Sequence, residues 1–205
     1  MKFIDLKEKL KDHICFSVND IIKIEPGFHS QRLSEWQKKK YIIKIAKDCY
    51  AFSSLEINDH ALFAIANKLY APSYISLEMA FSYYNFIPEG VYSITSVSSR
   101  LTNSFDTQIG YFSYRQIKPE LFFGYEIISF GSNSFSMAEA EKAVLDYFYL
   151  NPDVDNDDSF AELRINKESF LEEIDINKLN KYLTQFDNNS LERRIESFIA
   201  YLKND

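Results

Sequence analysis

The densest group of positively charged side chains lies between His29 and Lys47, where the only acid is Glu35. The basic residues there are Arg32, Lys38, Lys39, Lys40, Lys44 and Lys47. Clustered ammonium and guanidinium groups neutralise phosphates and release the counterions condensed on nucleic acid, so this stretch favours nucleic-acid binding. A solvated helix face has a similar composition, and charge alone therefore leaves both interpretations open.

Signatures of catalysis are missing from the sequence. It contains no glycine-rich phosphate loop, no G-x-S-x-G motif and no H-E-x-x-H motif. The histidines, His13, His29 and His60, lie far apart along the chain, and surface or capping roles suit them better than catalysis or metal binding. We therefore expect no enzymatic activity, no metal site and no cofactor.

Two acidic groupings resemble sites. Residues 153–158 begin like a calcium-binding loop, but Asp158 occupies the position of the turn glycine, so a solvated linker is the better interpretation. Glu141, Lys142 and Asp146 fall on a predicted helix, where the i, i+4 spacing of Lys142 and Asp146 indicates a surface ion pair. We expect this trio to hold the helix against a sheet, and a functional surface is the alternative.

Composition places the chain among folded proteins, since 205 residues with 46% hydrophobic content can bury a core. No apolar run reaches the ~18 residues needed to span a bilayer. The first ten residues alternate charged and apolar side chains at helical spacing, unlike a signal peptide. Cys15 and Cys49 are the only cysteines and the core needs no disulfide, so we expect a cytoplasmic protein without a membrane partner.

Charge is segregated along the chain. Residues 1–52 hold 11 lysine and arginine residues against 7 aspartate and glutamate residues, although the whole chain has a net charge of −7. Segregated charge predicts two modules with different partners. We place them at residues 1–56 and 57–205.

The first module is predicted to contain three short helices and a hairpin. Ser17 is a suitable N-cap for the second helix, and Pro26-Gly27 breaks that helix. The predicted helices cover residues 2–13, the stretch from residue 18 to just before Glu25, and residues 30–40; the predicted strands cover residues 41–45 and 49–52. This order is that of a winged helix-turn-helix domain.

The third helix has a polar face that suits DNA. Leu33 and Trp36 lie on its inner side, and the opposite side chains can reach base edges or phosphates when a helix enters the major groove. Lysines on the hairpin would contact the flanking phosphate backbone. The predicted DNA-binding residues are Gln31, Arg32, Ser34, Glu35, Lys38, Lys39, Lys44 and Lys47. A winged fold that serves only protein contacts is the alternative.

The second module is predicted to mix helices and strands. Helices are expected over residues 59–70, 77–84, 138–150, 177–185 and 191–202, and strands over residues 91–98, 103–106, 111–116 and 121–128, with residues 151–158 as a linker. Ser136 or its neighbours would open the helix at 138, and Arg100, Arg115 and Lys118 could form a secondary nucleic-acid surface. The predicted fold class is α+β, a winged helix-turn-helix followed by a mixed α/β domain with a small antiparallel sheet and C-terminal helices.

Several ordered sequence blocks point to a known family. The segment YISLEMAFSYY at residues 74–84 is followed by further blocks at residues 87–89, 91–95, 102–105, 110–114, 117–125 and 140–146. Together they resemble AbiEi-like antitoxins, the transcriptional-regulator half of type IV toxin–antitoxin systems of abortive infection. Many relatives have glycine where this chain has Lys40 and Asp48.

The resemblance implies a DNA-binding transcriptional autorepressor and antitoxin. Its winged domain would bind promoter DNA of its own operon, and its larger domain would counteract a cognate nucleotidyltransferase-like toxin. One alternative is a stand-alone winged-helix transcription factor whose C-terminal domain senses a ligand or a protein. The other is a protein-interaction module that binds no DNA.

Overall fold

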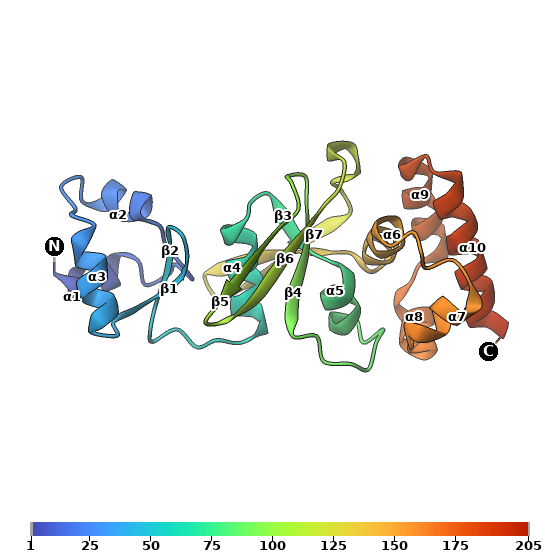
Figure 1. Ribbon diagram of the computed structural model, residues 1–205, viewed down its shortest axis with the longest axis horizontal. Coiled ribbons are helices and arrows are strands. Elements are labelled where there is room, and N and C mark those ends of the chain that lie inside the picture. Colours follow the sequence, from blue (N-terminus) through green and yellow to red (C-terminus); the bar gives the residue numbers. More distant parts are fainter. Residues whose placement is uncertain (1, 205) are drawn as a thin grey trace.

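The computed structural model describes residues 2–204 (Figure 1). Its N-terminal part consists of three short helices and a β-hairpin. They are α1 (Phe3–Lys9), α2 (Val18–Ile24), α3 (Gln31–Lys38), β1 (Ile42–Ala46) and β2 (Cys49–Phe52). Ser17 starts α2 as predicted, because its side chain accepts a hydrogen bond from Asp20 N–H while Asp20 accepts one from Ser17 N–H. We call residues 2–56 the N-terminal module.

The first helix is shorter than predicted and ends at Lys9 rather than near residue 13. Beyond it the chain becomes extended, because Phe16 and Tyr50 exchange two backbone hydrogen bonds of 2.8 and 2.9 Å. Lys40 and Asp48 adopt left-handed backbone conformations with φ of 55° and 57°. Glycine is favoured at such angles. The two turns of the hairpin region nevertheless adopt this geometry with a lysine and an aspartate at these positions.

The N-terminal module has a hydrophobic core of its own. Leu6, Ile21, Leu33 and Trp36 from the three helices pack with Leu10, the C-cap of α1, and each is 5% exposed or less. One face of the hairpin closes this core with Phe52 and its neighbours Ile42 and Tyr50. The apolar sides of the three short helices thus pack against the hairpin.

The other face of the hairpin packs against the next part of the chain. Ile45, Cys49 and Ala51 belong to the larger hydrophobic core, which includes Ala61 and Ile65 of α4 (Asp59–Leu69). β2 is therefore buried on both faces. The two predicted modules meet across a packed junction.

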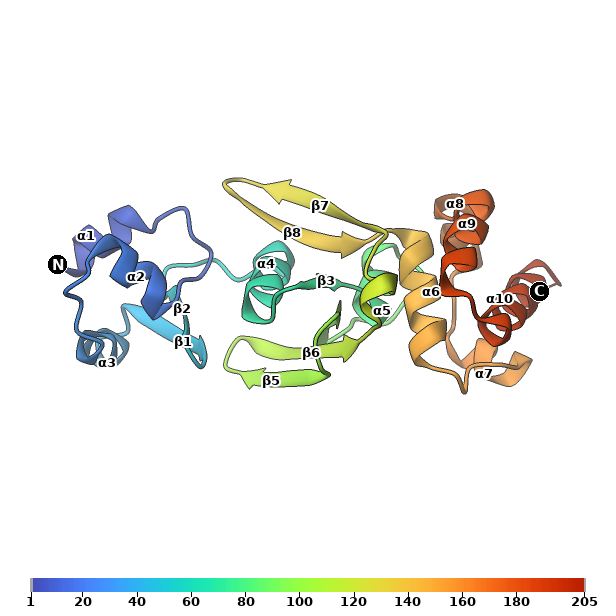
Figure 2. The same cartoon turned by 90° about the horizontal axis from the view of Figure 1, so that it is seen from above.

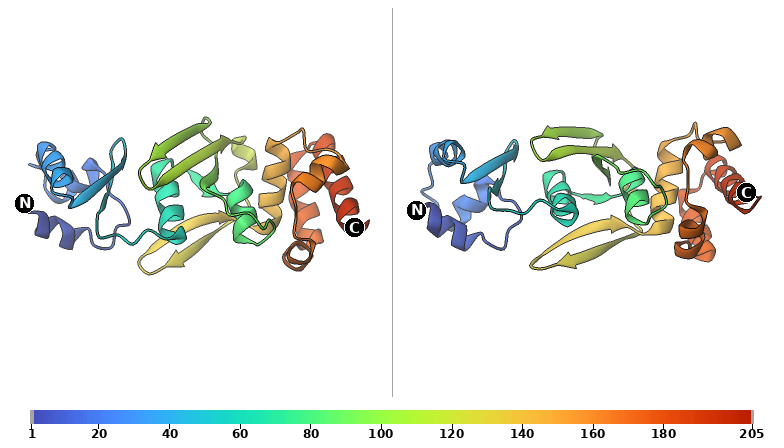
Figure 3. Two further views of the ribbon diagram at one scale, coloured as in Figure 1. Left: turned by 60° about the horizontal axis from the view of Figure 1, so that its bottom comes forward. Right: turned by 90° about the horizontal axis from the view of Figure 1, so that it is seen from below.

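A six-stranded sheet forms the centre of the molecule. Its strands are β3 (Ser73–Ile75), β4 (Ser93–Ser98), β5 (Asn103–Thr107), β6 (Gly110–Gln116), β7 (Tyr125–Phe130) and β8 (Asn133–Ala138), in the order β5-β6-β4-β3-β8-β7. The β4–β6 and β3–β8 pairs are parallel and the other pairs antiparallel. At the end that faces the N-terminal module, α4 lies between the β5–β6 and β7–β8 hairpins (Figures 2 and 3).

Helices complete the chain beyond and beside the sheet. They are α5 (Leu77–Tyr83), a 3₁₀ turn at Pro119–Leu121, α6 (Ala140–Leu150), α7 (Asp157–Glu162), α8 (Lys167–Glu173), α9 (Ile176–Phe186) and α10 (Asn189–Asn204). α6 lies between the sheet and the last four helices (Figure 2). No helix within residues 2–204 combines the length and the apolar character that crossing a membrane requires.

The predicted α+β class is confirmed, but the larger part differs from its prediction. The sheet of the second module is mixed and six-stranded rather than small and antiparallel. Ser136 lies in β8 and does not open α6, and the predicted strand at residues 121–128 begins only at Tyr125. The expected acidic linker ends early because α7 starts at Asp157, where Asn156 caps it through Ser159 N–H.

Candidate nucleic-acid interface

α3 is anchored to the N-terminal module by its two apolar side chains. Leu33 is 3% exposed and Trp36 is 5% exposed. The indole of Trp36 lies 5.7 Å from the ring of Phe3 in an edge-on arrangement and 5.7 Å from the ring of Phe28. This packing fixes the rotation of the helix about its axis.

The opposite side of α3 is polar and open to solvent. Because a helix turns by ~100° per residue, fixing Leu33 and Trp36 inward directs the other side chains outward. The exposed residues of this surface are Gln31, Ser34, Glu35, Lys38 and Lys39, while Arg32 is half-buried beside them. Five of the eight predicted DNA-binding residues thus lie on α3 and a sixth, Lys39, is its C-cap; all six except Arg32 are exposed.

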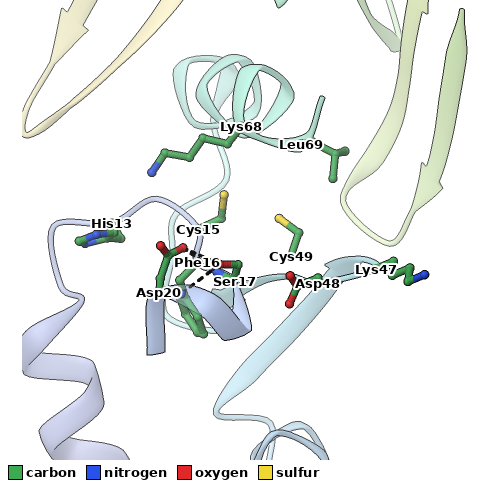
Figure 4. Close-up of a pocket in the computed structure, with 10 residues that line it drawn as sticks. All are labelled: His13, Cys15, Phe16, Ser17, Asp20, Lys47, Asp48, Cys49, Lys68 and Leu69. Atoms are coloured by element: carbon green, nitrogen blue, oxygen red, sulfur yellow. Dashed lines mark hydrogen bonds between the residues drawn. The ribbon is translucent and has the colours of Figure 1, made fainter. Parts of the chain in front are cut away.

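Lys44 and Lys47 lie apart from that surface, on the hairpin. Both are exposed, but the hairpin adjoins the central part of the molecule. The carbonyl oxygen of Lys44 accepts a 2.8 Å hydrogen bond from Gln108 Nε2 in the β5–β6 turn. Lys47 lies at the hairpin tip beside the junction with α4 (Figure 4).

The lysines of this region keep their charge uncompensated. Within residues 2–204, Lys38, Lys39, Lys44 and Lys47 form no ion pair. By contrast, the guanidinium groups proposed for a secondary surface are engaged within the fold. Arg115 Nη2 donates to Leu150 O at 2.7 Å, and Arg100 lies 4.2 Å from the centre of the Tyr70 ring and donates to the carbonyl oxygen of Ala71.

The expectation of a surface ion pair between Lys142 and Asp146 is wrong. Both side chains, on α6, are fully buried and form an ion pair with each other. Asp146 Oδ2 accepts hydrogen bonds from Tyr74 Oη and Ser76 Oγ, both 2.9 Å long. Burial lowers the pKa of Lys142 and raises that of Asp146 against the attraction between them.

The trio containing this pair holds α6 against β3 of the sheet, as expected, and it also joins α6 to α9. Lys142 Nζ also donates to Tyr74 Oη at 2.9 Å, which closes a network with β3. Glu141 accepts a hydrogen bond from Asp175 N–H and pairs with Lys178 of α9 at 2.9 Å. Within the described residues no three histidine, cysteine, aspartate or glutamate side chains form a group that could hold a metal ion.

A cavity of about 510 Å³ lies at the junction of the N-terminal module with α4, and it was not predicted from the sequence. It opens between β2 and α4, and Cys15, Cys49, Asp20 and Lys68 line it (Figure 4). Both cysteines are buried free thiols. Nothing local in the sequence signals this site, because residues 15, 49 and 68 meet only when the two parts of the chain pack.

Comparison of the chain with protein-family models gave no match, and comparison with curated proteins gave none either.

Proposed function

We propose that the chain is a DNA-binding transcriptional autorepressor whose residues 1–56 form a winged helix-turn-helix domain. The observation that carries this proposal is the exposed polar surface of α3 opposite Leu33 and Trp36. The order α2, turn, α3, hairpin is the order of elements in that domain class. α3 would be the recognition helix.

Each part of this surface suits a different contact with DNA. Gln31 begins α3, and the first residues of a recognition helix are those that reach base edges. A glutamine amide can pair with adenine through two hydrogen bonds. Lys38 and Lys39 end the helix and would bind phosphates, which gives affinity without sequence information.

The hairpin would act as a wing of restricted mobility. Residues of its outer face belong to the larger hydrophobic core, and Gln108 donates a hydrogen bond to the backbone at Lys44. Phosphate contacts from this wing would therefore come from the exposed Lys44 and Lys47 alone. The proposed partner is promoter DNA of the chain's own operon.

The resemblance at residues 74–150 supports a second, linked proposal. The chain would also be the antitoxin of a type IV toxin–antitoxin system, acting in the cytoplasm and counteracting a nucleotidyltransferase-like toxin. This activity would reside in residues 57–205. No catalytic role is proposed for any residue.

The DNA-binding proposal is tested with the full-length chain, because Cys49 and Ala51 of β2 belong to the larger hydrophobic core and a fragment would expose them. Fluorescence anisotropy is measured with a duplex from upstream of the gene and with a scrambled duplex, over a range of salt concentrations. Replacement of Lys38, Lys39 and Lys44 by alanine should weaken binding to both duplexes and reduce the salt slope by roughly three phosphate contacts.

A charge-matched variant provides the control. Lys181, Arg193 and Lys203 are exposed, lie on α9 and α10 and are distant in sequence from α3, and their replacement by alanine changes the net charge equally. This variant should bind almost as the wild type does. Equal losses in both triple variants would show that net charge and not the α3 surface determines affinity.

The antitoxin proposal is tested by growth rescue with the gene next to this one. Co-expression should restore growth if that gene encodes the toxin, and rescue should persist in the triple variant of Lys38, Lys39 and Lys44. Intact DNA binding without rescue would favour the stand-alone transcription factor instead.

A further inference from the structure

Two thiols, those of Cys15 and Cys49, lie near each other at the junction of the N-terminal module with α4. The hydrogen-bonded pair Phe16 and Tyr50 brings their chain segments together, and Cys15 and Cys49 flank that pair on the same face of the ladder. Both sulfur atoms point toward α4 (Figure 4). Both side chains line the same cavity, so the two thiols share one solvent-accessible space.

The surroundings give the two thiols different roles. Interaction with the neighbouring Cys49 thiol lowers the pKa of Cys15 most, and the Lys68 ammonium lowers it further against the effect of burial. Interaction with the Cys15 thiol and burial raise the pKa of Cys49, although Lys68 acts in the opposite direction there too. Cys15 therefore carries more thiolate and is the nucleophile of the pair.

Small molecules can reach this pair in spite of its burial. Cys15 is 4% exposed and Cys49 is 8% exposed, yet both line the cavity of about 510 Å³. The side chains of His13, Asp20 and Lys68 also line it, so the entrance is polar. A peroxide has the size and polarity to enter.

We propose that Cys15 and Cys49 are a reversible redox site that hydrogen peroxide converts into an intramolecular disulfide. The Cys15 thiolate attacks one peroxide oxygen, the O–O bond breaks, and the leaving hydroxide takes a proton to become water. Cys49, losing its proton, then attacks the Cys15 sulfenic acid; the S–S bond forms and a second water leaves. Two thiols are oxidised, one peroxide is reduced, and a cellular thiol reverses the bond.

Closure of the disulfide would act on the N-terminal module. An S–S bond is ~2.05 Å long, so the two sulfurs must move closer than any thiol contact. Cys49 adjoins the hairpin tip, where Asp48 Oδ1 accepts a 3.0 Å hydrogen bond from Val18 N–H at the start of α2. The movement therefore alters the hairpin tip, its contact with α4 and the first turn of α2.

The chemistry is tested on the reduced full-length chain with hydrogen peroxide as the probe. Thiol titration after unfolding should show both thiols lost for one peroxide consumed, and peptide mapping should find Cys15 joined to Cys49 within one chain. Retained thiols, links between chains, or Cys15 oxidised to sulfinic acid would overturn the proposal.

Two variants test the assigned roles. Cys49→Ser should stop the reaction at a Cys15 sulfenic acid that dimedone traps. Lys68→Met should slow the loss of thiols several-fold, while Lys181→Met, which removes an exposed lysine of α9, should not. Equal rates in both lysine variants would overturn the activation of this thiol pair by Lys68, and absence of a dimedone adduct on Cys15 in Cys49→Ser would overturn Cys15 as the nucleophile.

Hydrogen exchange tests the structural consequence without DNA. Oxidation of the wild type should change exchange in residues 16–20 and 46–50, and treated Cys49→Ser should not show that change. A disulfide that forms without altering exchange there would overturn the coupling to α2. Because DNA is absent, these results are independent of the proposed DNA binding.

Discussion

α3 and α6 both have oppositely charged residues at i, i+4 spacing, but the charges are exposed on α3 and buried on α6. Glu35 of α3 and Lys39, the C-cap of that helix, are four residues apart, as are Lys142 and Asp146 on α6. The first two side chains are exposed to solvent, whereas the second two are fully buried. An i, i+4 pair therefore does not by itself indicate where the pair lies.

The flanking residues decide between these outcomes. α3 has an apolar side with Leu33 and Trp36 and polar residues elsewhere. α6 is apolar around most of its circumference, with Ala140, Ala143, Val144, Leu145 and Phe148 all buried. A helix that is apolar on all sides is enclosed by the protein, and its charged residues are enclosed with it.

The largest expected effect is on α6. Lys142→Met would leave Asp146 buried without its cation, which typically destabilises a fold by ~3–5 kcal/mol. Chemical denaturation followed by circular dichroism measures this loss. If Lys142 proves to be exposed in solution, the loss will be under about 1 kcal/mol, and the contrast with α3 fails.

The same variant has a pH dependence with a definite sign. Burial raises the pKa of Asp146 in the folded chain, so folding favours its protonated form. Stability from this group is present at low pH and is lost as the pH rises through the folded pKa. Without Lys142 that pKa rises further, so the destabilisation should be smaller near about pH 5 than near about pH 8. Replacing Asp146 by leucine as well should recover most of the stability.

On α3 the buried side should matter most for stability. Trp36→Ala removes an indole that is 5% exposed and contacts the rings of Phe3 and Phe28. Loss of a buried tryptophan costs roughly 3–5 kcal/mol. A melting temperature like that of the wild type would mean that α3 is turned the other way, with its polar side inward.

Local patterns predicted the N-terminal module better than the rest. Ser17, the breaker at Pro26-Gly27 and the runs at residues 41–45 and 49–52 specify their elements by short-range chemistry, and the structure has these elements. β3 was missed because three residues between Pro72 and Ser76 carry no alternation that marks a strand. β8 was assigned partly to the helix that follows it, because its role depends on pairing with β3 and β7, far away in sequence.

The candidate sites divide in the same way. The exposed side of α3 follows from 3.6-residue periodicity within eight residues, so Gln31, Ser34, Glu35 and Lys38 could be placed from the sequence. The cavity at Cys15 and Cys49 required the packing of the hairpin on α4. No local rule predicts such a contact.

A smaller effect than that of Trp36→Ala is expected on the recognition of DNA bases by the polar side of α3. Gln31→Ala should leave the melting temperature nearly unchanged because Gln31 is exposed. It should lower the preference for the upstream duplex over the scrambled one by ~1–3 kcal/mol if the contact is bidentate. Anisotropy titrations at one salt concentration measure both affinities. An equal loss on the two duplexes would show that Gln31 binds phosphate and reads no base.

The smallest effect provides the most direct comparison of the two helices. A double-mutant cycle with Glu35→Ala and Lys39→Ala should give a coupling energy of about 0.5 kcal/mol or less, because exposed charges are screened by water and salt. The corresponding cycle with Lys142→Met and Asp146→Leu should give a coupling several times larger, since each single variant strands a buried charge. Raising the salt concentration should reduce the coupling on α3 and leave that on α6 nearly unchanged. Similar couplings in both cycles would mean that helical spacing, and not burial, sets the strength of these pairs.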